Sequence, residues 1–420
     1  MNLKLNSIIA KNVEIFFLTI LIFLISLSCF FPLPAGGGQV GIKARPLNII
    51  DRYFYINDAH PFSENGYGEF KGGPLYPKVL KGVSFISIKI FKQTTTSSFW
   101  NTIVIFISSI LSFCTLRLFY FSGKNLLNEQ TGIIAMALYA ACPYTYFYTL
   151  SGGITIYTLF GSSACTYFIL KIQKSSDNSK FKESRLFLKV VLSIFLIFMA
   201  LLRPDSMIFS LIISIILIIK EYMNFKSYKF NTRLLFLYIL FFSIPLAISL
   251  HQLWETKMYS IIAMDDFASE GGTFLGYDRD LIREKINIMR NNSELLIKVK
   301  SIILQIIWKI NDCFTGLIDL RDTHEATSNS LFSFLIRVSI GSLFLAPITY
   351  ISIVGIFIYK KLLLKTNLWI CFIASLLAIS PSLLGVSMSR YYFMFITPFI
   401  LITSVTLNQM YSSQMKKNIQ

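Results

Sequence analysis

An acidic residue flanked by basic and aromatic residues follows the first long apolar segment of the sequence. The stretch runs Asp51-Arg52-Tyr53-Phe54-Tyr55 and continues to Asp58-Ala59. An aspartate close to a membrane surface, beside arginine and tyrosine, can act as a general base, pair with a cation or bind a metal. A solvated acidic side chain in a loop is the alternative interpretation. Asp51 is therefore the first candidate for a catalytic group.

Two arginines lie next to helix-start signals and could bind an anion. The first is in Leu201-Leu202-Arg203-Pro204-Asp205, and the second is in Ser389-Arg390-Tyr391-Tyr392, ahead of Pro398. A guanidinium binds phosphate through a planar fork of donors. The alternatives are that Arg203 extends to lipid headgroups and that Arg390 anchors an aromatic belt. Pro204 suits the first turn of a helix, and we expect Asp205 to cap that helix.

The composition indicates a chain that faces lipid. Of 420 residues, 54% are hydrophobic and 15% are charged, and the mean hydropathy is +0.61. A soluble protein carries about 25% charged residues. The formal net charge of +17 comes from lysines and arginines that flank apolar runs, with no basic soluble domain and no zinc-finger spacing. The charge therefore indicates membrane topology and anionic lipids, and we expect no nucleic-acid partner.

Long apolar segments predict an all-α polytopic protein with about ten transmembrane helices, since a span needs about 20 apolar residues. We place them at 14–34, 101–121, 131–150, 153–171, 187–203, 205–220, 233–250, 333–358, 367–386 and 391–408. The first segment has the basic flank of a signal peptide, but it is long and no A-x-A cleavage site follows. We expect it to be a retained helix.

The distribution of lysine and arginine predicts the orientation. With the N-terminus in the cytoplasm, the short turns on the opposite side carry only Arg203 and Arg390. The short inner segments then carry Lys4, Lys11, Lys124, Lys171, Lys174, Lys180, Lys182, Arg185, Lys220, Lys226, Lys229, Arg233, Lys360, Lys361, Lys365, Lys416 and Lys417. This asymmetry follows the positive-inside rule. We therefore expect both termini in the cytoplasm, in the plasma or inner membrane if the source is bacterial.

Two long polar segments then fall on the outer side, at 35–100 and 251–332. The second holds more than half of the 22 acidic residues. Apolar residues alternate with lysine at 79–91 and 295–310, which is typical of amphipathic helices in the membrane interface. With no internal repeat and no linker, residues 1–420 are expected to form a single membrane domain with these two outer loops. Six cysteines without a C-x-x-C pair argue against a disulfide framework or a zinc site, and the three separated histidines form no ligand motif.

The order of these motifs resembles that of the GT-C superfold of membrane glycosyltransferases. This group includes the dolichyl-phosphate-mannose protein mannosyltransferases and the lipid A aminoarabinose transferases. The matching residues are Asp51-x3-Tyr55-x3-Ala59, Pro74-Leu75-Tyr76-Pro77, Cys142-Pro143, Leu202-Arg203-Pro204-Asp205, and Arg390-Tyr391 followed by Pro398. Two positions depart from the pattern. Arg52 replaces an acid, and the Ser151-Gly152-Gly153 turn lacks the second acid that many members carry, so these residues do not support a divalent metal, and the requirement for one stays open.

The resemblance implies a glycosyltransferase that uses a polyprenyl-phosphate sugar on the outer membrane face. Asp51 would deprotonate a lipid, glycan or protein acceptor as it attacks the anomeric carbon, with inversion in one displacement. Arg390 and Arg203 would stabilise the phosphate leaving group, with Arg52 as a second choice. Tyr55 and Tyr391 are expected to line the substrate site beside these groups.

Two other functions fit the same sequence. An O-antigen polymerase or ligase would use arginine or histidine in a large late outer loop, where His251, Arg279, Arg283 and His324 are candidates. A transporter or flippase of lipid-linked sugars would place polar residues in paired broken helices near the membrane midplane. The charged residues of this chain instead gather at helix ends and in loops.

Overall fold

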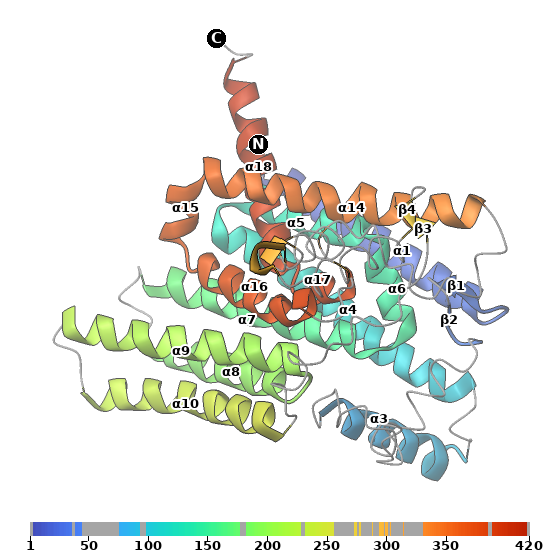
Figure 1. The fold of residues 1–420 in the computed structure, drawn as a ribbon, viewed down its shortest axis with the longest axis horizontal. Helices are drawn as coiled ribbons and strands as arrows, with labels where there is room; N and C mark the ends of the chain where they lie inside the picture. Colours follow the sequence, from blue (N-terminus) through green and yellow to red (C-terminus); the bar gives the residue numbers. More distant parts are fainter. Residues whose placement is uncertain are drawn as a thin grey trace.

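The computed structural model describes residues 3–35, 38–43, 75–92, 98–176, 182–227, 232–255, 273–274, 277–278, 331–384 and 389–417, with a few isolated positions between 288 and 314. Nearly all of them are helical (Figure 1). The N-terminal half contains α1 (Leu3–Ser28), α3 (Leu75–Phe85), α4 (Ser98–Leu126), α5 (Glu129–Ala141), α6 (Pro143–Ser151), α7 (Ile154–Ser176), α8 (Lys182–Ala200) and α9 (Pro204–Ser227). The C-terminal half contains α10 (Thr232–Glu255), α14 (Leu331–Ile358), α15 (Lys360–Lys365), α16 (Leu368–Leu384), α17 (Ser389–Met394) and α18 (Thr397–Lys417).

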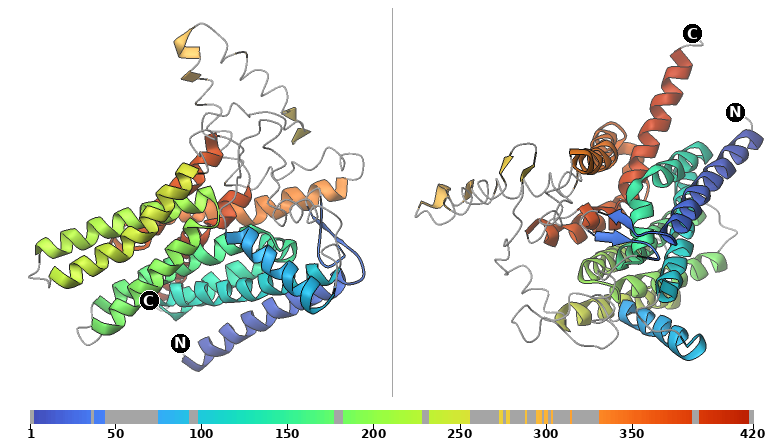
Figure 2. Two further views of the ribbon diagram at one scale, coloured as in Figure 1. Left: turned by 90° about the horizontal axis from the view of Figure 1, so that it is seen from below. Right: turned by 90° about the vertical axis from the view of Figure 1, so that its right-hand side faces the viewer.

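The long helices run up and down through one bundle. Every segment predicted to span a membrane contains a helix, and α7, α8, α9 and α10 contact one another in chain order (Figure 1). The end at which α6 meets α7 and α8 meets α9 is called the Arg203 end. The opposite end, where α7 finishes and α8 begins, is called the Lys189 end. The two termini lie near each other in all three views (Figure 2).

Three described helical segments are long and apolar enough to cross a membrane: Leu5–Ser28, Phe99–Leu126 and Asp205–Met223. The bent pair α5 and α6 would be a fourth. Large apolar side chains on α1 are exposed, among them Ile15, Phe16, Ile22 and Phe23, as a lipid-facing surface requires. The chain is an integral membrane protein, and its expected total of about ten spans stays a prediction.

Two of the predicted spans are broken helices, which corrects the sequence prediction. The segment at 131–150 consists of α5 and α6, bent by 59° at Cys142, because Pro143 cannot continue the first helix. The segment at 391–408 consists of α17 and α18, separated at Phe395 and Ile396. The Phe393 ring, next to the second break, contacts the rings of Tyr144 and Tyr148 on α6.

Side chains satisfy main-chain carbonyls at both breaks. At the first break, the Thr145 hydroxyl donates to the Tyr139 carbonyl at 3.0 Å, and the Tyr146 hydroxyl donates to that of Ala140 at 2.6 Å. At the second, the Ser162 hydroxyl of α7 donates to the Met394 carbonyl at 2.9 Å. Hydroxyl groups commonly replace lost helical hydrogen bonds inside a membrane. The breaks are therefore closed by the protein itself.

Short non-helical elements were not predicted in the outer loops. The strands β1 (Leu33–Ala35) and β2 (Gly38–Val40) form an antiparallel hairpin directly after α1. The strands β3 (Thr273–Phe274) and β4 (Tyr277–Asp278) form another. A three-residue strand has too little alternation to be recognised from sequence.

The predicted amphipathic segment at 79–91 is helical. It consists of α3 and a π-helical turn, η1 (Ile86–Ile90). The side chains of Tyr76, Leu80 and Val83 are buried at helical spacing, whereas Phe85, Ile86, Ile90 and Phe91 are exposed. Its position in a membrane interface stays a prediction. The second predicted amphipathic segment, 295–310, lies mostly outside the described residues.

Candidate functional site

The turn between α8 and α9 is fixed by hydrogen bonds around Arg203. The Arg203 main-chain amide donates to the Ser206 hydroxyl at 2.9 Å, and that hydroxyl donates back to the Arg203 carbonyl at 2.9 Å. Pro204 is the first residue of α9, as predicted. The contact that closes the helix start comes from Ser206 rather than from Asp205, so the predicted capping role of Asp205 is wrong.

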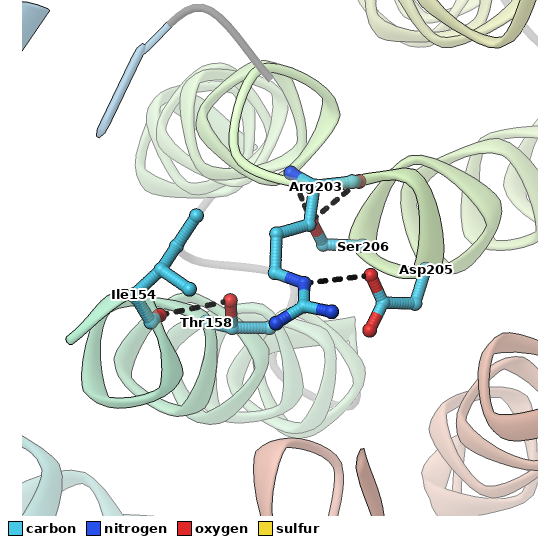
Figure 3. Close-up of polar contacts among 5 residues, drawn as sticks. All are labelled: Ile154, Thr158, Arg203, Asp205 and Ser206. Carbon is cyan, nitrogen blue, oxygen red and sulfur yellow. Dashed lines mark hydrogen bonds and ion pairs between the residues drawn. The ribbon is translucent and has the colours of Figure 1, made fainter. Parts of the chain in front are cut away.

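Asp205 instead forms an ion pair with Arg203. The Arg203 Nε donates to Asp205 Oδ1 at 3.0 Å, and the two side chains are 14% and 8% exposed. The guanidinium lies between Asp205 and Thr158 of α7 (Figure 3). Asp205, at the start of α9, therefore holds the Arg203 side chain against the protein. This differs from the alternative in which Arg203 extends to lipid headgroups.

One oxygen of Asp205 has no partner in the described part of the chain. Asp205 Oδ2 is buried and accepts no hydrogen bond there. Buried polar atoms nearly always have a partner, and a carboxylate accepts only. The atom is thus available to a hydroxyl or an ammonium donor. The adjacent guanidinium makes the same place unfavourable for a metal cation, and no group of three potential metal ligands occurs among the described residues.

The end of the first predicted outer loop is attached to the Arg203 end by two hydrogen bonds. The Tyr76 hydroxyl donates to the Gly152 carbonyl at 2.9 Å. The Leu75 amide donates to the Leu201 carbonyl at 3.0 Å. The Tyr76 ring also contacts the Tyr157 ring edge-to-face, with centroids 5.4 Å apart. The Leu75-Tyr76 pair, the turn at Gly152 and the Arg203 turn therefore meet at one place.

The start of the same loop is attached nearby. The Gly41 amide donates to the Leu150 carbonyl at 3.3 Å, and the Asn101 side-chain amide donates to the Ile42 carbonyl at 2.9 Å. Leu150 lies two residues before Gly152. Lys43 and Leu75, the described residues on either side of 44–74, therefore both lie at the Arg203 end.

The helix that carries Arg390 and Tyr391 packs against α7. Besides the contact of Ser162 with Met394, the hydroxyls of Ser163 and Thr397 lie 2.8 Å apart. Thr158, which faces the Arg203 guanidinium in Figure 3, lies one helical turn before Ser162. α7 is thus the common support of the Arg203 turn and of α17.

The structure tests only part of the predicted site. Arg203 is described fully. Arg390 and Tyr391 lie on α17, but their side chains lie outside the described residues, as do Asp51, Arg52 and Tyr55 entirely. Sequence reasoning missed the roles of Ser206 and Thr158, for which no pattern provides a signal. The contact of Tyr76 with Gly152 could have been found only by placing the P-L-Y-P stretch against the Gly-Gly turn.

The structure of this chain resembles that of an archaeal oligosaccharyltransferase. The similar structures are of the Archaeoglobus fulgidus enzyme: one complex with Zn and sulfate (14% identity, TM-score 0.44), one tethered to an acceptor peptide (12%, 0.46), and one with an inhibitory peptide and a dolichol-phosphate (15%, 0.44). They cover 86%, 86% and 88% of this chain, which spans 44%, 45% and 47% of theirs. No known protein family and no curated protein matches the sequence.

Proposed function

We propose that this chain is a membrane glycosyltransferase that moves a sugar from a polyprenyl-phosphate donor to a lipid, glycan or protein acceptor on the outer membrane face. The observation that carries the proposal is the contact among three stretches of the GT-C pattern. Two of them match that pattern, and the third, the turn at Gly152, departs from it. The Leu75-Tyr76 pair, the turn at Gly152 and the Arg203 turn are joined by direct hydrogen bonds. Residues far apart in sequence that gather at one helical end are typical of a site.

Asp51 is the proposed general base. It lies in the segment between Lys43 and Leu75, both of which are held at the Arg203 end. The carboxylate would take the proton of the acceptor hydroxyl or amine as the acceptor attacks the anomeric carbon. The bond to the phosphate oxygen breaks in the same step, so the configuration inverts and the lipid phosphate leaves with the electron pair.

The leaving phosphate needs positive charge. Arg390 on α17 and Arg203 are the proposed donors, because both helices are supported by the same face of α7. Asp205 would fix the direction of the Arg203 guanidinium through the 3.0 Å contact. Arg52, Tyr55 and Tyr391 are the proposed additional substrate contacts.

The polyprenyl chain needs an apolar path beside the site. Exposed apolar side chains follow one another at the end of α3, along η1 and just after it, namely Phe85, Ile86, Ile90 and Phe91. Tyr76 attaches α3 to Gly152. We expect this amphipathic segment to lie in the membrane interface. It would guide the lipid tail while the phosphate enters the Arg203 end.

The test is sugar transfer by purified protein from polyprenyl-phosphate sugars, comparing wild type with Asp51→Asn. We expect transfer by the wild type and a loss of about 100-fold or more in the variant, since a general base contributes at least that much. Asp58→Asn, in the same segment, is the matched control and should keep most of the activity. Equal activity of Asp51→Asn and wild type would remove Asp51 from the mechanism and favour a polymerase or ligase that uses the second outer loop.

A transporter of lipid-linked sugars is the second candidate, favoured by the two broken helices that meet at Phe393. Transporter sites use the open main-chain groups of such helices. Here the carbonyls of Tyr139, Ala140 and Met394 already accept hydrogen bonds from side chains, which favours the transferase. Movement of a fluorescent lipid-linked sugar across liposomes by this protein, without sugar transfer, would support the transporter.

A further inference from the structure

We propose that the Lys189 end of the bundle holds a binding site for a phosphate group, supplied by an anionic lipid of the cytoplasmic leaflet. The site is formed by Arg185 and Lys189 of α8, Lys220 and Glu221 of α9, and Asn367 at the start of α16. These five residues are called the inner cluster. The inner cluster lies at the opposite end of α8 and α9 from Arg203, so it is separate from the proposed transferase site.

The centre of the inner cluster is a buried ion pair. Lys189 Nζ lies 2.7 Å from Glu221 Oε1, and the Lys189 side chain is 1% exposed. Charged groups are buried only when other charges or dipoles compensate them. The Glu221 carboxylate compensates Lys189, which leaves the other two cations of the inner cluster to be accounted for.

Neither of those two cations forms a salt bridge with a carboxylate among the side chains that the structure describes, although the Glu221 charge also acts on Lys220. Lys220 Nζ donates to the Asn367 side-chain oxygen, which is a neutral group. Arg185 Nε is a buried atom without a hydrogen-bond partner. The charges of both residues act on Lys189, so the three cations lie within electrostatic range of one another. The described inner cluster thus has three positive charges and one negative charge.

The groups that surround Lys220 are held in place from two further elements. The Gln173 side chain of α7 accepts from the Asn367 amide at 2.5 Å and donates to the Lys365 carbonyl at 2.6 Å. These bonds hold the main chain at Asn367, whose side-chain oxygen accepts from Lys220. A preorganised set of donors with excess positive charge is what a phosphate group requires.

The membrane provides such a group at this position. The charge pattern places the Lys189 end in the cytoplasm, where the leaflet contains anionic lipids. A headgroup phosphate could reach Arg185 and Lys220 from the edge of the bundle and supply the missing negative charge. Inorganic phosphate has the same chemistry, so the test must separate the two sources.

The experiment measures binding of phosphatidylglycerol, phosphatidylcholine and inorganic phosphate to the purified full chain in detergent, by titration of its thermal unfolding midpoint. We expect stabilisation by phosphatidylglycerol and not by phosphatidylcholine. Arg185→Gln and Lys220→Gln should each weaken phosphatidylglycerol binding about fivefold, the usual effect of one basic residue near an anionic surface. Lys174→Gln, which removes an exposed lysine from the same end of α7, should leave binding unchanged.

Each outcome decides the proposal. One outcome is that inorganic phosphate stabilises the wild type at concentrations similar to those of the lipid, with the effect lost in Arg185→Gln. That result would support the phosphate site but would show that its ligand is free phosphate and not a lipid. Equal stabilisation by both lipids would overturn the proposal. This comparison needs only the wild-type protein, so it decides the question even if the variants fold poorly. Equal stabilisation would mean that another carboxylate of the chain, such as Glu183, neutralises the inner cluster.

Discussion

The Tyr76 hydroxyl donates a hydrogen bond to the main-chain carbonyl of Gly152, at 2.9 Å and across 76 positions of sequence. Tyr76 is buried on the inner side of α3, and Gly152 forms the turn between α6 and α7. This contact, together with the bond from the Leu75 amide to the Leu201 carbonyl, attaches the start of α3 to the bundle.

We predict that Tyr76→Phe loosens the attachment of the first outer loop. The change removes the donor and leaves the buried Gly152 carbonyl without its partner, which should cost about 1–2 kcal/mol of unfolding free energy in detergent micelles. Limited proteolysis between residues 43 and 75 should become faster. Tyr411→Phe, on the exposed part of α18, is the control and should change neither quantity. Unchanged proteolysis in Tyr76→Phe would show that other contacts hold α3.

Gly152→Ala should be strongly unfavourable. Gly152 has φ +64°, and an added Cβ would lie 2.4 Å from Val104 Cγ1 on α4. Both the left-handed backbone and the overlap oppose a side chain, and together they should reduce the unfolding free energy by about 2–3 kcal/mol. The matched control is Gly82→Ala on α3, where an added Cβ meets nothing within 4 Å. That control should be neutral or stabilising by about 0.5 kcal/mol, because alanine favours a helix.

The helices of this chain could be predicted because hydropathy and charge act over long segments. The breaks could not be predicted as clearly, since Pro143 also occurs in helices that only kink. Pro398 in the first turn of α18 is a helix-start signal, but the second break also involves a hydrogen bond from Ser162 on another helix. Long-range contacts of this kind are decided by packing and leave no local pattern.

The candidate site was predictable only in part. The Arg203-Pro204-Asp205 run indicates a helix start, but propensity favours Asp205 as the cap, and the neighbouring Arg203 charge attracts its carboxylate instead. The hydroxyl of Ser206 then makes the cap contact. The attraction of Arg203, two residues away, thus outweighs the usual preference of aspartate for capping. The sequence alone does not show which of the two interactions Asp205 makes.

Breaking the Arg203 and Asp205 pair should affect both stability and the proposed activity. Asp205→Asn leaves a mostly buried guanidinium without its counter-charge, which should cost about 3 kcal/mol. The double variant Arg203→Gln/Asp205→Asn should recover part of that stability, because the lone charge is gone. It should not recover sugar transfer if Arg203 holds the leaving phosphate. The check is a double-mutant cycle in unfolding free energy with transfer rates for the same four proteins.

A different result would change the interpretation of this pair. If the unfolding free energy of Asp205→Asn is within about 0.5 kcal/mol of the wild-type value, the ion pair does not contribute to stability. If the double variant transfers sugar as fast as wild type, Arg203 does not contact the phosphate, and Arg390 remains as the candidate.

The predicted orientation can be tested with a native cysteine. Cys29 is exposed and follows α1 at the Arg203 end. In intact cells or oriented vesicles of a Cys313→Ser background, a membrane-impermeant maleimide should label Cys29 from the outside. A cysteine introduced by Lys174→Cys, at the Lys189 end, should react only after the membrane is opened. Labelling of the second position alone in sealed cells would reverse the topology, and with it the side on which sugar transfer is expected.

The buried pair of Lys189 and Glu221 should be far more costly to break than an exposed one. Glu221→Gln leaves Lys189, which is 1% exposed, without a counter-charge, and we expect a loss of about 3–5 kcal/mol. Lys124→Gln, which opens the 3.6 Å pair with Glu129 where Lys124 is 48% exposed, should cost less than about 1 kcal/mol. Replacing both buried partners, Lys189→Met/Glu221→Leu, should recover most of the lost stability, because the buried Lys189 charge is removed together with its counter-charge. Denaturant unfolding in micelles measures all three.

A Glu221→Gln effect as small as that of Lys124→Gln would mean that another anion neutralises Lys189 in place of Glu221. A bound lipid phosphate is the first candidate for that anion.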